Sequence, residues 1–444
     1  MNIKRIGLLT LGCSKNLTDS EYIVSKLTKA GYQVSTDETD VDVILVNTCG
    51  FIEPAKKESI ESILQAVQMK KEGRIQKVIV TGCMVERYFK ELKKEIPEVD
   101  DFILIKDYPH IGQRLESIFN NGKTRALVEK DRRLLYDDYN DRTLLTPKHY
   151  AYLKIGEGCN HKCGFCMIPA MRGRFVSREI DALVGEAKVL GERGVKELIL
   201  IAQDATYYGL DMPKKTSLAV LLRRLAHETS VEWIRILYAY PTTLTSEMID
   251  VIAEEKKICK YIDMPLQHAS DTMLKRMRRG YTHKKICELL KKIRSRIPEV
   301  GLRTTMIVGY PGEKEEDYQR LEDFVKEMKF ERLGVFQYSD EENSFAYNLD
   351  HKVPDVVKKE RYARLMEIQK KVSEKTNENL IGRIVRVLVD DVKKNEGESI
   401  GRTEWDAPEV DQNVIISKAE LKPGQFANVK IEDALEYDLI GQVC

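Results

Sequence analysis

The sequence has neither a large net charge nor a long apolar run. Its 444 residues carry 72 Lys+Arg against 71 Asp+Glu, a net charge of +1. That balance removes the simplest argument for a nucleic-acid binder, which is an overall basic surface. No apolar run approaches the roughly 18 residues that a membrane span needs. The N-terminus also lacks the apolar region and small-residue cleavage site of a signal peptide, so we expect a cytoplasmic protein.

The chain has no internal repeats and no low-complexity tracts. Its mean hydropathy of −0.38 and its charged fraction of 32% are typical of a soluble globular protein. At roughly 150 residues per domain, the length predicts about three domains. We place an N-terminal domain at 1–121, a charged linker at 122–148, a central domain at 149–375 and a C-terminal domain at 376–444.

The N-terminal domain alternates between apolar strands and amphipathic helices. Strands are predicted at 6–11, 43–46, 78–80 and 102–105. Helices are predicted at 19–30, 54–71 and 85–95. Strands separated by helices favour an α/β fold with a doubly wound parallel sheet.

The same alternation resumes in the central domain and runs about six times. Strands are predicted at 150–155, 197–202, 233–238, 261–264, 302–308 and 333–337. Six sequential units favour a partial (β/α)6 barrel, whose chemistry lies at the C-terminal ends of the strands. After a helix at 354–378, residues 382–443 are rich in Val and Ile and contain short turn signals. That pattern predicts a small antiparallel β-barrel.

Three of the nine cysteines lie within eight residues. Cys159, Cys163 and Cys166 (the loop set) have the spacing C-x3-C-x2-C and follow the first predicted barrel strand. Disulfides are rare in the cytosol, so three thiols this close point to a metal centre. Structural zinc needs a fourth ligand, for which His161 is the only nearby candidate. An iron–sulfur cubane on three cysteines instead leaves one iron open for an external ligand.

Three further cysteines are far apart in the sequence but occupy equivalent positions. Cys13, Cys49 and Cys83 (the sheet-edge set) each lie at or just past the end of a predicted parallel strand, beside a glycine. The carboxyl ends of parallel strands share one edge of the sheet, so these thiols can converge on a second cluster. Singly, each is more often a buried core thiol. The remaining three, Cys259, Cys287 and Cys444, are interpreted as packing or terminal residues.

The loop set after a barrel strand resembles the radical S-adenosylmethionine (SAM) superfamily, and nearly the whole chain resembles its methylthiotransferase branch. The C-terminal segment looks like a TRAM domain. The motifs that carry the resemblance are both cysteine sets, Gly156-Glu157-Gly158-Cys159, Ile168-Pro169, Arg172-Gly173, Ala202-Gln203-Asp204 and the run from Met264 to Ser270. Within the branch, Gly12-Cys13-Ser14-Lys15-Asn16 and Asp19-Ser20-Glu21 resemble the enzymes that modify a ribosomal protein. The tRNA-modifying relatives usually carry Gln-Met-Asn after that cysteine.

The resemblance implies two 4Fe-4S clusters and S-adenosyl-L-methionine as cofactors. It implies that the loop-set cluster reduces SAM to a radical that removes hydrogen from an unactivated carbon. The sheet-edge cluster would supply sulfur, which a second SAM methylates. The acceptor would be the β-carbon of an aspartate in the twelfth small-subunit ribosomal protein. The enzyme would need an electron donor, and no catalytic residue is assigned beyond the cluster ligands.

The resemblance also suggests residues that contact SAM. Gln203 and Asp204 end the second barrel strand, where the superfamily holds the SAM amino group. Gly309 ends the fifth strand, where adenine usually packs, and Arg303 in that strand could reach the SAM carboxylate. A polar strand end, a loop glycine and a solvated charge are equally good interpretations of these residues.

The C-terminal segment is acidic. From Thr376 to Ile440 there are 8 Lys+Arg and 14 Asp+Glu, a net charge of 8 − 14 = −6. An RNA binder should be basic, whereas an acidic domain suits a basic partner such as a ribosomal protein. We therefore expect acids of this domain to be exposed for docking, among them Glu404, Asp406, Glu409 and Asp411.

Two alternatives remain open at this point. A tRNA adenosine methylthiotransferase would share both clusters, with tRNA as its partner. A non-catalytic iron–sulfur electron carrier would explain the cysteines but not the barrel-like units that follow them. Formation of 5′-deoxyadenosine from SAM separates an enzyme from a carrier.

Overall fold

The computed structural model describes residues 4–37, 39–119, 142–213, 216–393, 395, 397–417, 419 and 421–444. Most of the predicted linker, at 122–141, lies outside the described residues. The chain forms two compact units. The first consists of Met1–Leu145, Gly156–His161 and Cys166–Arg178, and the second of Thr146–Ile155, Lys162–Phe165 and Glu179–Cys444. The domain boundaries drawn from the sequence stay a prediction.

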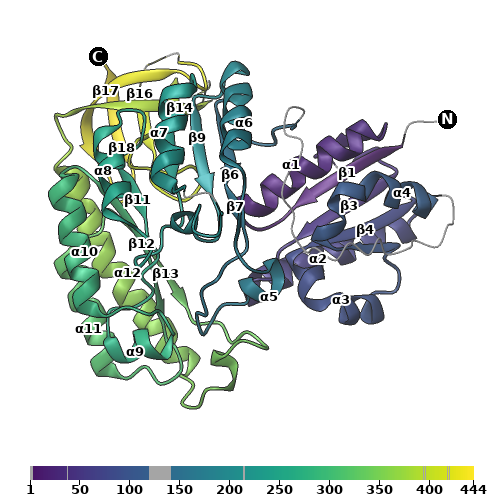
Figure 1. The fold of residues 1–444 in the computed structure, drawn as a ribbon, viewed down its shortest axis with the longest axis horizontal. Coiled ribbons are helices and arrows are strands. Elements are labelled where there is room, and N and C mark those ends of the chain that lie inside the picture. Colours follow the sequence, from purple (N-terminus) through teal and green to yellow (C-terminus); the bar gives the residue numbers. More distant parts are fainter. Residues whose placement is uncertain are drawn as a thin grey trace. The chain divides into compact units, whose positions relative to one another are not determined.

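The first unit contains the doubly wound sheet that the sequence predicts (Figure 1). Five parallel strands lie in the order β2-β1-β3-β4-β5. Their bounds are β1 Arg5–Thr10, β2 Gln33–Ser35, β3 Val43–Thr48, β4 Lys77–Gly82 and β5 Asp101–Ile103. The sequence does not predict β2, because this three-residue edge strand is largely exposed and carries no apolar run.

Helices cover both faces of this sheet. Their bounds are α1 Ser14–Lys29, α2 Glu53–Lys71, α3 Cys83–Glu95, η1 Ile105–His110 and α4 Ile111–Phe119. Alternate strand residues point to opposite faces, so Leu8 packs with α1 and α4 whereas Val46 packs with α2 and α3. Burial on both sides explains why these strands read as continuous apolar runs.

A short segment from the middle of the sequence completes the first unit. Strands β7 Gly156–Glu157 and β8 Val176–Ser177 pair antiparallel, and helix α5 Ile168–Arg172 lies between them in the sequence. Helix α5 packs against α3. The residues that flank the loop set therefore fold with the N-terminal sheet.

The second unit contains the six predicted barrel strands. They form two parallel three-stranded sheets, β10-β9-β6 and β11-β12-β13. Their bounds are β6 Tyr150–Lys154, β9 Glu197–Ile201, β10 Trp233–Ile236, β11 Tyr261–Asp263, β12 Gly301–Val308 and β13 Arg332–Gln337. The two sheets continue into each other where the Ala239 N–H, just past β10, donates to the carbonyl of Asp263, the last residue of β11, at 2.8 Å. This arrangement is the expected partial barrel.

Helices alternate with these strands, and Figure 1 shows α10, α11 and α12 along one side of β11, β12 and β13. The helices are α6 Ile180–Glu192, α7 Leu218–Glu228, α8 Ser246–Glu254, α9 Asp271–Arg276, α10 His283–Arg296, α11 Glu315–Met328 and α12 Asp355–Glu378. Two 3₁₀ turns, η2 Ala205–Tyr207 and η3 Ala346–Asn348, complete them. Within the described part of the chain, no helix combines the length and apolarity needed to cross a membrane.

The C-terminal domain is the predicted small barrel, with one difference. Its strands close in the order β14-β15-β16-β18-β17. Their bounds are β14 Ile384–Lys393, β15 Glu398–Thr403, β16 Val414–Ser417, β17 Phe426–Ala434 and β18 Leu439–Val443. The pair β16–β18 is parallel, whereas the sequence predicts an antiparallel barrel throughout. The reason is that β18 inserts between β16 and β17, and no local pattern reveals such an insertion.

The C-terminal domain closes the N-terminal ends of the barrel strands. Four strands begin with a side chain bonded to it: Tyr150 to Glu409 at 3.2 Å, Glu197 to Arg402 at 2.8 Å, Tyr261 to Asp411 at 2.7 Å and Arg332 to Asp406 at 2.6 Å. Arg235 of β10 pairs with the same Glu197 at 2.6 Å. The side chains of Glu197, Arg235 and Arg402 are at most 2% exposed. Buried charges need such partners, so the network fixes this domain on the barrel.

The acids proposed for docking are mostly used inside the second unit. Asp406 is fully buried, and the Asp411 side chain is 2% exposed and pairs with Arg303. Glu404 accepts a hydrogen bond from the Lys260 backbone N–H at 2.9 Å. The prediction that these acids are exposed is therefore wrong for Asp406 and Asp411, whereas Glu409 is exposed as predicted. A charge count cannot separate acids facing solvent from acids paired with distant arginines.

Candidate iron–sulfur and SAM sites

The structure brings the sheet-edge set to one end of the parallel sheet. Cys13 precedes α1 just after β1, Cys49 follows β3 directly, and Cys83 follows β4 and begins α3. The strands are in register, with Thr10 beside Asn47 and Asn47 beside Thr81, so all three end at the same level. None of the nine cysteines, all of which lie among the described residues, forms a disulfide. Three thiols thus face the carboxyl edge of the sheet, as the strand positions predict.

Glycines keep side chains out of the space around these sulfurs. Gly12 has φ +91°, and a Cβ added there would lie 3.1 Å from the Cys49 Sγ. Gly82 has φ +98°, and its added Cβ would lie 2.4 Å from the Thr48 carbonyl oxygen. Such positions admit only glycine, because other residues are strained at positive φ and lack room. Free thiols around a space kept clear by glycines fit an iron–sulfur cluster.

Burial makes the thiolate forms of this set costly. Desolvation raises the pKa of Cys83 to about 12 even though Arg172 lowers it. Desolvation also raises the pKa of Cys49. Only the thiolate binds metal, so positive charge is needed beside these sulfurs. Iron would supply part of it, and the Arg172 guanidinium adds positive charge beside Cys83.

Arg172 connects the motif residues of the first unit. Its side chain is 2% exposed and pairs with Asp19 at 2.6 Å and with Glu157 at 3.4 Å. One guanidinium nitrogen, Nη2, donates to the Asn16 Oδ1 at 2.7 Å and to the Cys83 Sγ at 3.1 Å. The motifs around residues 12–21, 156–159 and 172–173 therefore meet at one buried guanidinium.

Two cysteines of the loop set belong to the first unit. The Cys159 N–H donates to the Gly173 carbonyl at 3.1 Å, and the thiol is buried. Cys166 precedes Met167, which packs with Met171 and Cys83 in one apolar cluster. Within this unit, the chain on the C-terminal side of the loop set therefore lies against the sheet-edge set.

The third cysteine of the loop set belongs to the second unit and contacts Arg279. Nη1 of Arg279 donates to the Cys163 Sγ at 3.1 Å, Nε donates to the Tyr281 hydroxyl at 2.7 Å and Nη2 donates to the Pro265 carbonyl at 2.7 Å. The guanidinium lies 4.5 Å from the Tyr240 ring centre. Sequence reasoning missed Arg279, which lies 116 residues from Cys163.

The loop around Cys163 is tightly packed. The Gly164 N–H donates to the Met277 carbonyl at 2.9 Å, and the Gly164 carbonyl accepts from the Ala346 N–H at 2.8 Å. A Cβ at Gly164 would lie 2.6 Å from the Tyr310 hydroxyl. Phe165 packs on the same apolar cluster as Tyr310. The described residues contain no group of three or more His, Cys, Asp or Glu that could hold one metal ion.

Three of the four SAM candidates lie at the C-terminal ends of barrel strands. Gln203 and Asp204 follow β9, and the Asp204 carboxylate accepts from the Thr206 N–H at 3.0 Å and from its hydroxyl at 2.6 Å. Gly309 follows β12 with φ +77°, and its N–H donates to Glu313 at 2.9 Å. The structure therefore places Gln203, Asp204 and Gly309 at the edge where barrel chemistry occurs.

Arg303 lies toward the other end of the strands. It is the third residue of β12 and pairs with Asp263 at 3.1 Å and with Asp411 at 3.2 Å. It lines a cleft of about 380 Å³ between β13, α12 and the C-terminal domain. The structure does not bring Arg303 together with the other three candidates.

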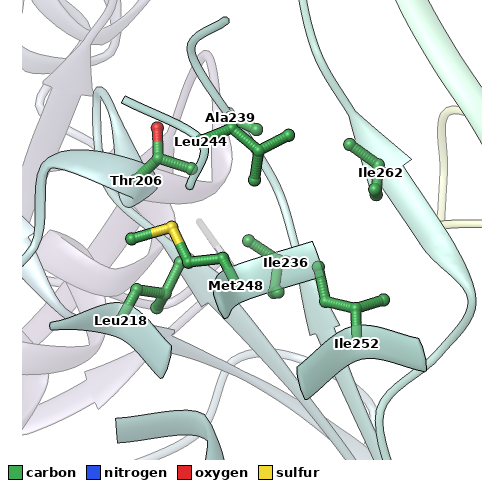
Figure 2. Close-up of a pocket in the computed structure, with 8 residues that line it drawn as sticks. All are labelled: Thr206, Leu218, Ile236, Ala239, Leu244, Met248, Ile252 and Ile262. Atoms are coloured by element: carbon green, nitrogen blue, oxygen red, sulfur yellow. The ribbon is translucent and has the colours of Figure 1, made fainter. Parts of the chain in front are cut away.

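A small apolar cavity lies between strands β10 and β11 and helices α7 and α8 (Figure 2). Its lining is Thr206, Leu218, Ile236, Ala239, Leu244, Met248, Ile252 and Ile262. At about 10 Å³ it holds at most one water molecule. It is a packing void and is too small for a cofactor.

The barrel and its three-cysteine loop define the class of radical SAM enzymes. Residues 153–325 match the Radical SAM superfamily, residues 5–104 match the uncharacterized protein family UPF0004, and residues 381–444 match the TRAM domain. Among solved structures, the radical SAM methyltransferase TsrM from Kitasatospora setae aligns with a TM-score of 0.55 at 14% identity. That alignment covers 76% of this chain and 75% of TsrM. Because the identity is low, this likeness shows the fold alone.

Curated relatives identify the family within this class. The chain is 48% identical over 440 residues to the ribosomal protein uS12 methylthiotransferase RimO of Christiangramia forsetii, covering 99% of this chain and 94% of that protein. It is 46% identical to the RimO of a Thermoanaerobacter species and 44% identical to that of Clostridioides difficile, covering 99% of this chain in both cases and 100% and 98% of those proteins. The chain belongs to the RimO family of ribosomal protein uS12 methylthiotransferases. This result confirms the ribosomal-protein branch over the tRNA-modifying branch.

Proposed function

We propose that this chain transfers a methylthio group to the β-carbon of an aspartate in ribosomal protein uS12. The observation that carries the proposal is identity of 44–48% over 99% of the chain to proteins named for uS12 methylthiotransfer. The two separate cysteine sets support it, because sulfur donation and radical formation are different tasks. A ribosomal-protein substrate is consistent with a cytoplasmic enzyme.

We assign one 4Fe-4S cluster to the sheet-edge set and a second, SAM-binding cluster to the loop set. When bound, these groups supply one-electron cleavage of SAM and the sulfur to be transferred. The chain holds the sulfurs in place: glycines clear the sheet edge, and the cluster of Met167 and Met171 keeps water from Cys83. A one-electron donor of unspecified identity is required as a partner.

For SAM we retain three of the four candidates, Gln203, Asp204 and Gly309. Their support is their position at the C-terminal ends of β9 and β12, within the second unit that also holds Cys163. We do not propose Arg303 as a SAM contact, because its guanidinium already pairs with two carboxylates toward the opposite ends of the strands.

Anaerobic reconstitution followed by an assay with SAM, reductant and purified uS12 tests the proposal. The expected results are iron for two clusters, 5′-deoxyadenosine, and uS12 heavier by one methylthio group. Changing the loop set to Ala should leave one cluster and abolish 5′-deoxyadenosine. Product on tRNA and none on uS12 would contradict the proposal, as would 5′-deoxyadenosine from the variant.

A further inference from the structure

In each cysteine set, one sulfur accepts a hydrogen bond from a buried arginine. We propose that Arg172 and Arg279 set the reduction potentials of the two clusters, Arg172 for the sheet-edge cluster and Arg279 for the loop cluster. This inference rests on the proposed function, since it takes both sets as cluster ligands. Each arginine is a positioning residue that acts through its cysteine.

Arg172 meets Cys83 through two nitrogens. Its Nη2 and Nε lie 3.1 and 3.3 Å from the Sγ, within the range of N–H donation to sulfur. Its charge is shared, because Asp19 and Glu157 pair with the same guanidinium. The two carboxylates fix the arginine but also offset much of its charge at the sulfur.

Arg279 meets Cys163 through one nitrogen, and its other contacts are neutral. Tyr281, Pro265 and the Tyr240 ring hold the guanidinium, which is 5% exposed. No carboxylate pairs with Arg279 among the residues that the structure describes. Its positive charge therefore acts on Cys163 with little compensation, in surroundings that screen charge poorly.

The physical effect follows from charge. A cluster that accepts one electron becomes more negative, and no bond forms or breaks in that step. A fixed cation and N–H donors at a ligand sulfur stabilise the reduced form and raise the potential. Because Arg279 is less compensated than Arg172, the effect of Arg279 on its cluster should be the larger.

The test measures each cluster alone. Changing all three cysteines of one set to Ala isolates the other cluster, whose midpoint potential is then obtained by electron paramagnetic resonance during titration with dithionite. Arg279→Met should lower the equilibrium constant for reduction of the loop cluster about tenfold or more, equal to about 59 mV for one electron. Arg172→Met should lower that of the sheet-edge cluster by less. Each Lys variant, which keeps the charge, should lie between Met and wild type.

Arg332→Met is the matched control, because it removes a buried arginine that pairs with Asp406 and contacts no cysteine. It should move neither potential. Iron content and circular dichroism establish that each variant is folded and holds its cluster. Where a Met variant holds no iron, the potential of the Lys variant at the same position is compared with wild type instead.

Three results would overturn the inference. The first is that each Met variant leaves the equilibrium constant for reduction of the cluster it contacts within about twofold of wild type. The others are that either variant shifts both clusters equally, or that Arg332→Met produces a similar shift. Two assembled clusters with unmoved potentials would defeat this inference and leave the proposed function intact. Wild-type protein that binds no cluster would defeat both.

Discussion

Removing the Asp406 carboxylate should weaken the attachment of the C-terminal domain to the barrel. Asp406 is fully buried and pairs with Arg332 at 2.6 Å, so Asp406→Ala leaves the guanidinium buried without that partner. Breaking a buried ion pair in this way costs about 3–5 kcal/mol. A domain is stable by only about 5–15 kcal/mol, so the loss should be large enough to measure easily.

The two tryptophans of the chain report this contact. Trp405 packs on Gly301, since a Cβ added at Gly301 would lie 2.9 Å from the Cβ of Trp405. The Trp233 ring lies edge-on to the Phe426 ring, with 4.9 Å between the ring centres. Tryptophan fluorescence during urea unfolding should therefore show an earlier transition for Asp406→Ala.

A double-mutant cycle separates the ion pair from other effects of the substitution. The double variant with Arg332→Met removes both charges, so its cost should fall short of the summed single costs by about 0.5–3 kcal/mol. A transition of Asp406→Ala within about 0.5 kcal/mol of wild type would refute the reasoning.

Three further predictions concern the cluster sites and the buried charges. Changing the sheet-edge set to Ala should preserve formation of 5′-deoxyadenosine but end methylthiolation of uS12, measured by chromatography and mass spectrometry. Methylthio product at the wild-type level would contradict the sulfur-donor role. Gly82→Ala should reduce the iron held by that set, because the new Cβ would meet the Thr48 carbonyl. The control Gly73→Ala lies at φ +75° in open space, so it should lower the free energy of unfolding by only about 1–2 kcal/mol and keep the iron. Burial disfavours the charge of Glu197, but Arg235 and Arg402 outweigh it and hold its pKa below the usual range. The stability that Glu197 contributes is therefore present above its unfolded pKa of about 4.3 and is lost as the pH falls through its folded pKa. The melting temperature of Glu197→Gln should therefore fall less steeply with acid than that of wild type.

Local patterns explain what could be predicted from the sequence. Apolar strand runs and their spacing predict the parallel sheet and the six barrel strands, and they place Cys13, Cys49 and Cys83 at strand ends. Strand ends share an edge, so the convergence of these thiols needed no long-range information. The ligand role of the cysteines stays a prediction.

Long-range pairings explain what could not be predicted. Three arginines lie within residues 276–279, and nothing nearby shows that Arg276 turns to the Pro311 carbonyl, Arg278 to Phe345 and Arg279 to Cys163. The burial of Asp406 and Asp411 in the C-terminal domain does not show in the sequence for the same reason. Asp406 and its partner Arg332 are 74 residues apart, so the sequence shows the charge but not the pair.

The closure of the barrel by the C-terminal domain has a consequence for synthesis of the chain. Arg235 donates to the carbonyl of Glu404, which the ribosome adds 169 residues later. At about 5–20 residues per second, that delay is about 8–34 s. During this interval the strand starts carry charges whose partners do not yet exist, and the nascent barrel is open to chaperones and proteases. Completion of the fold is therefore a late event, timed by the emergence of the last strands from the ribosome.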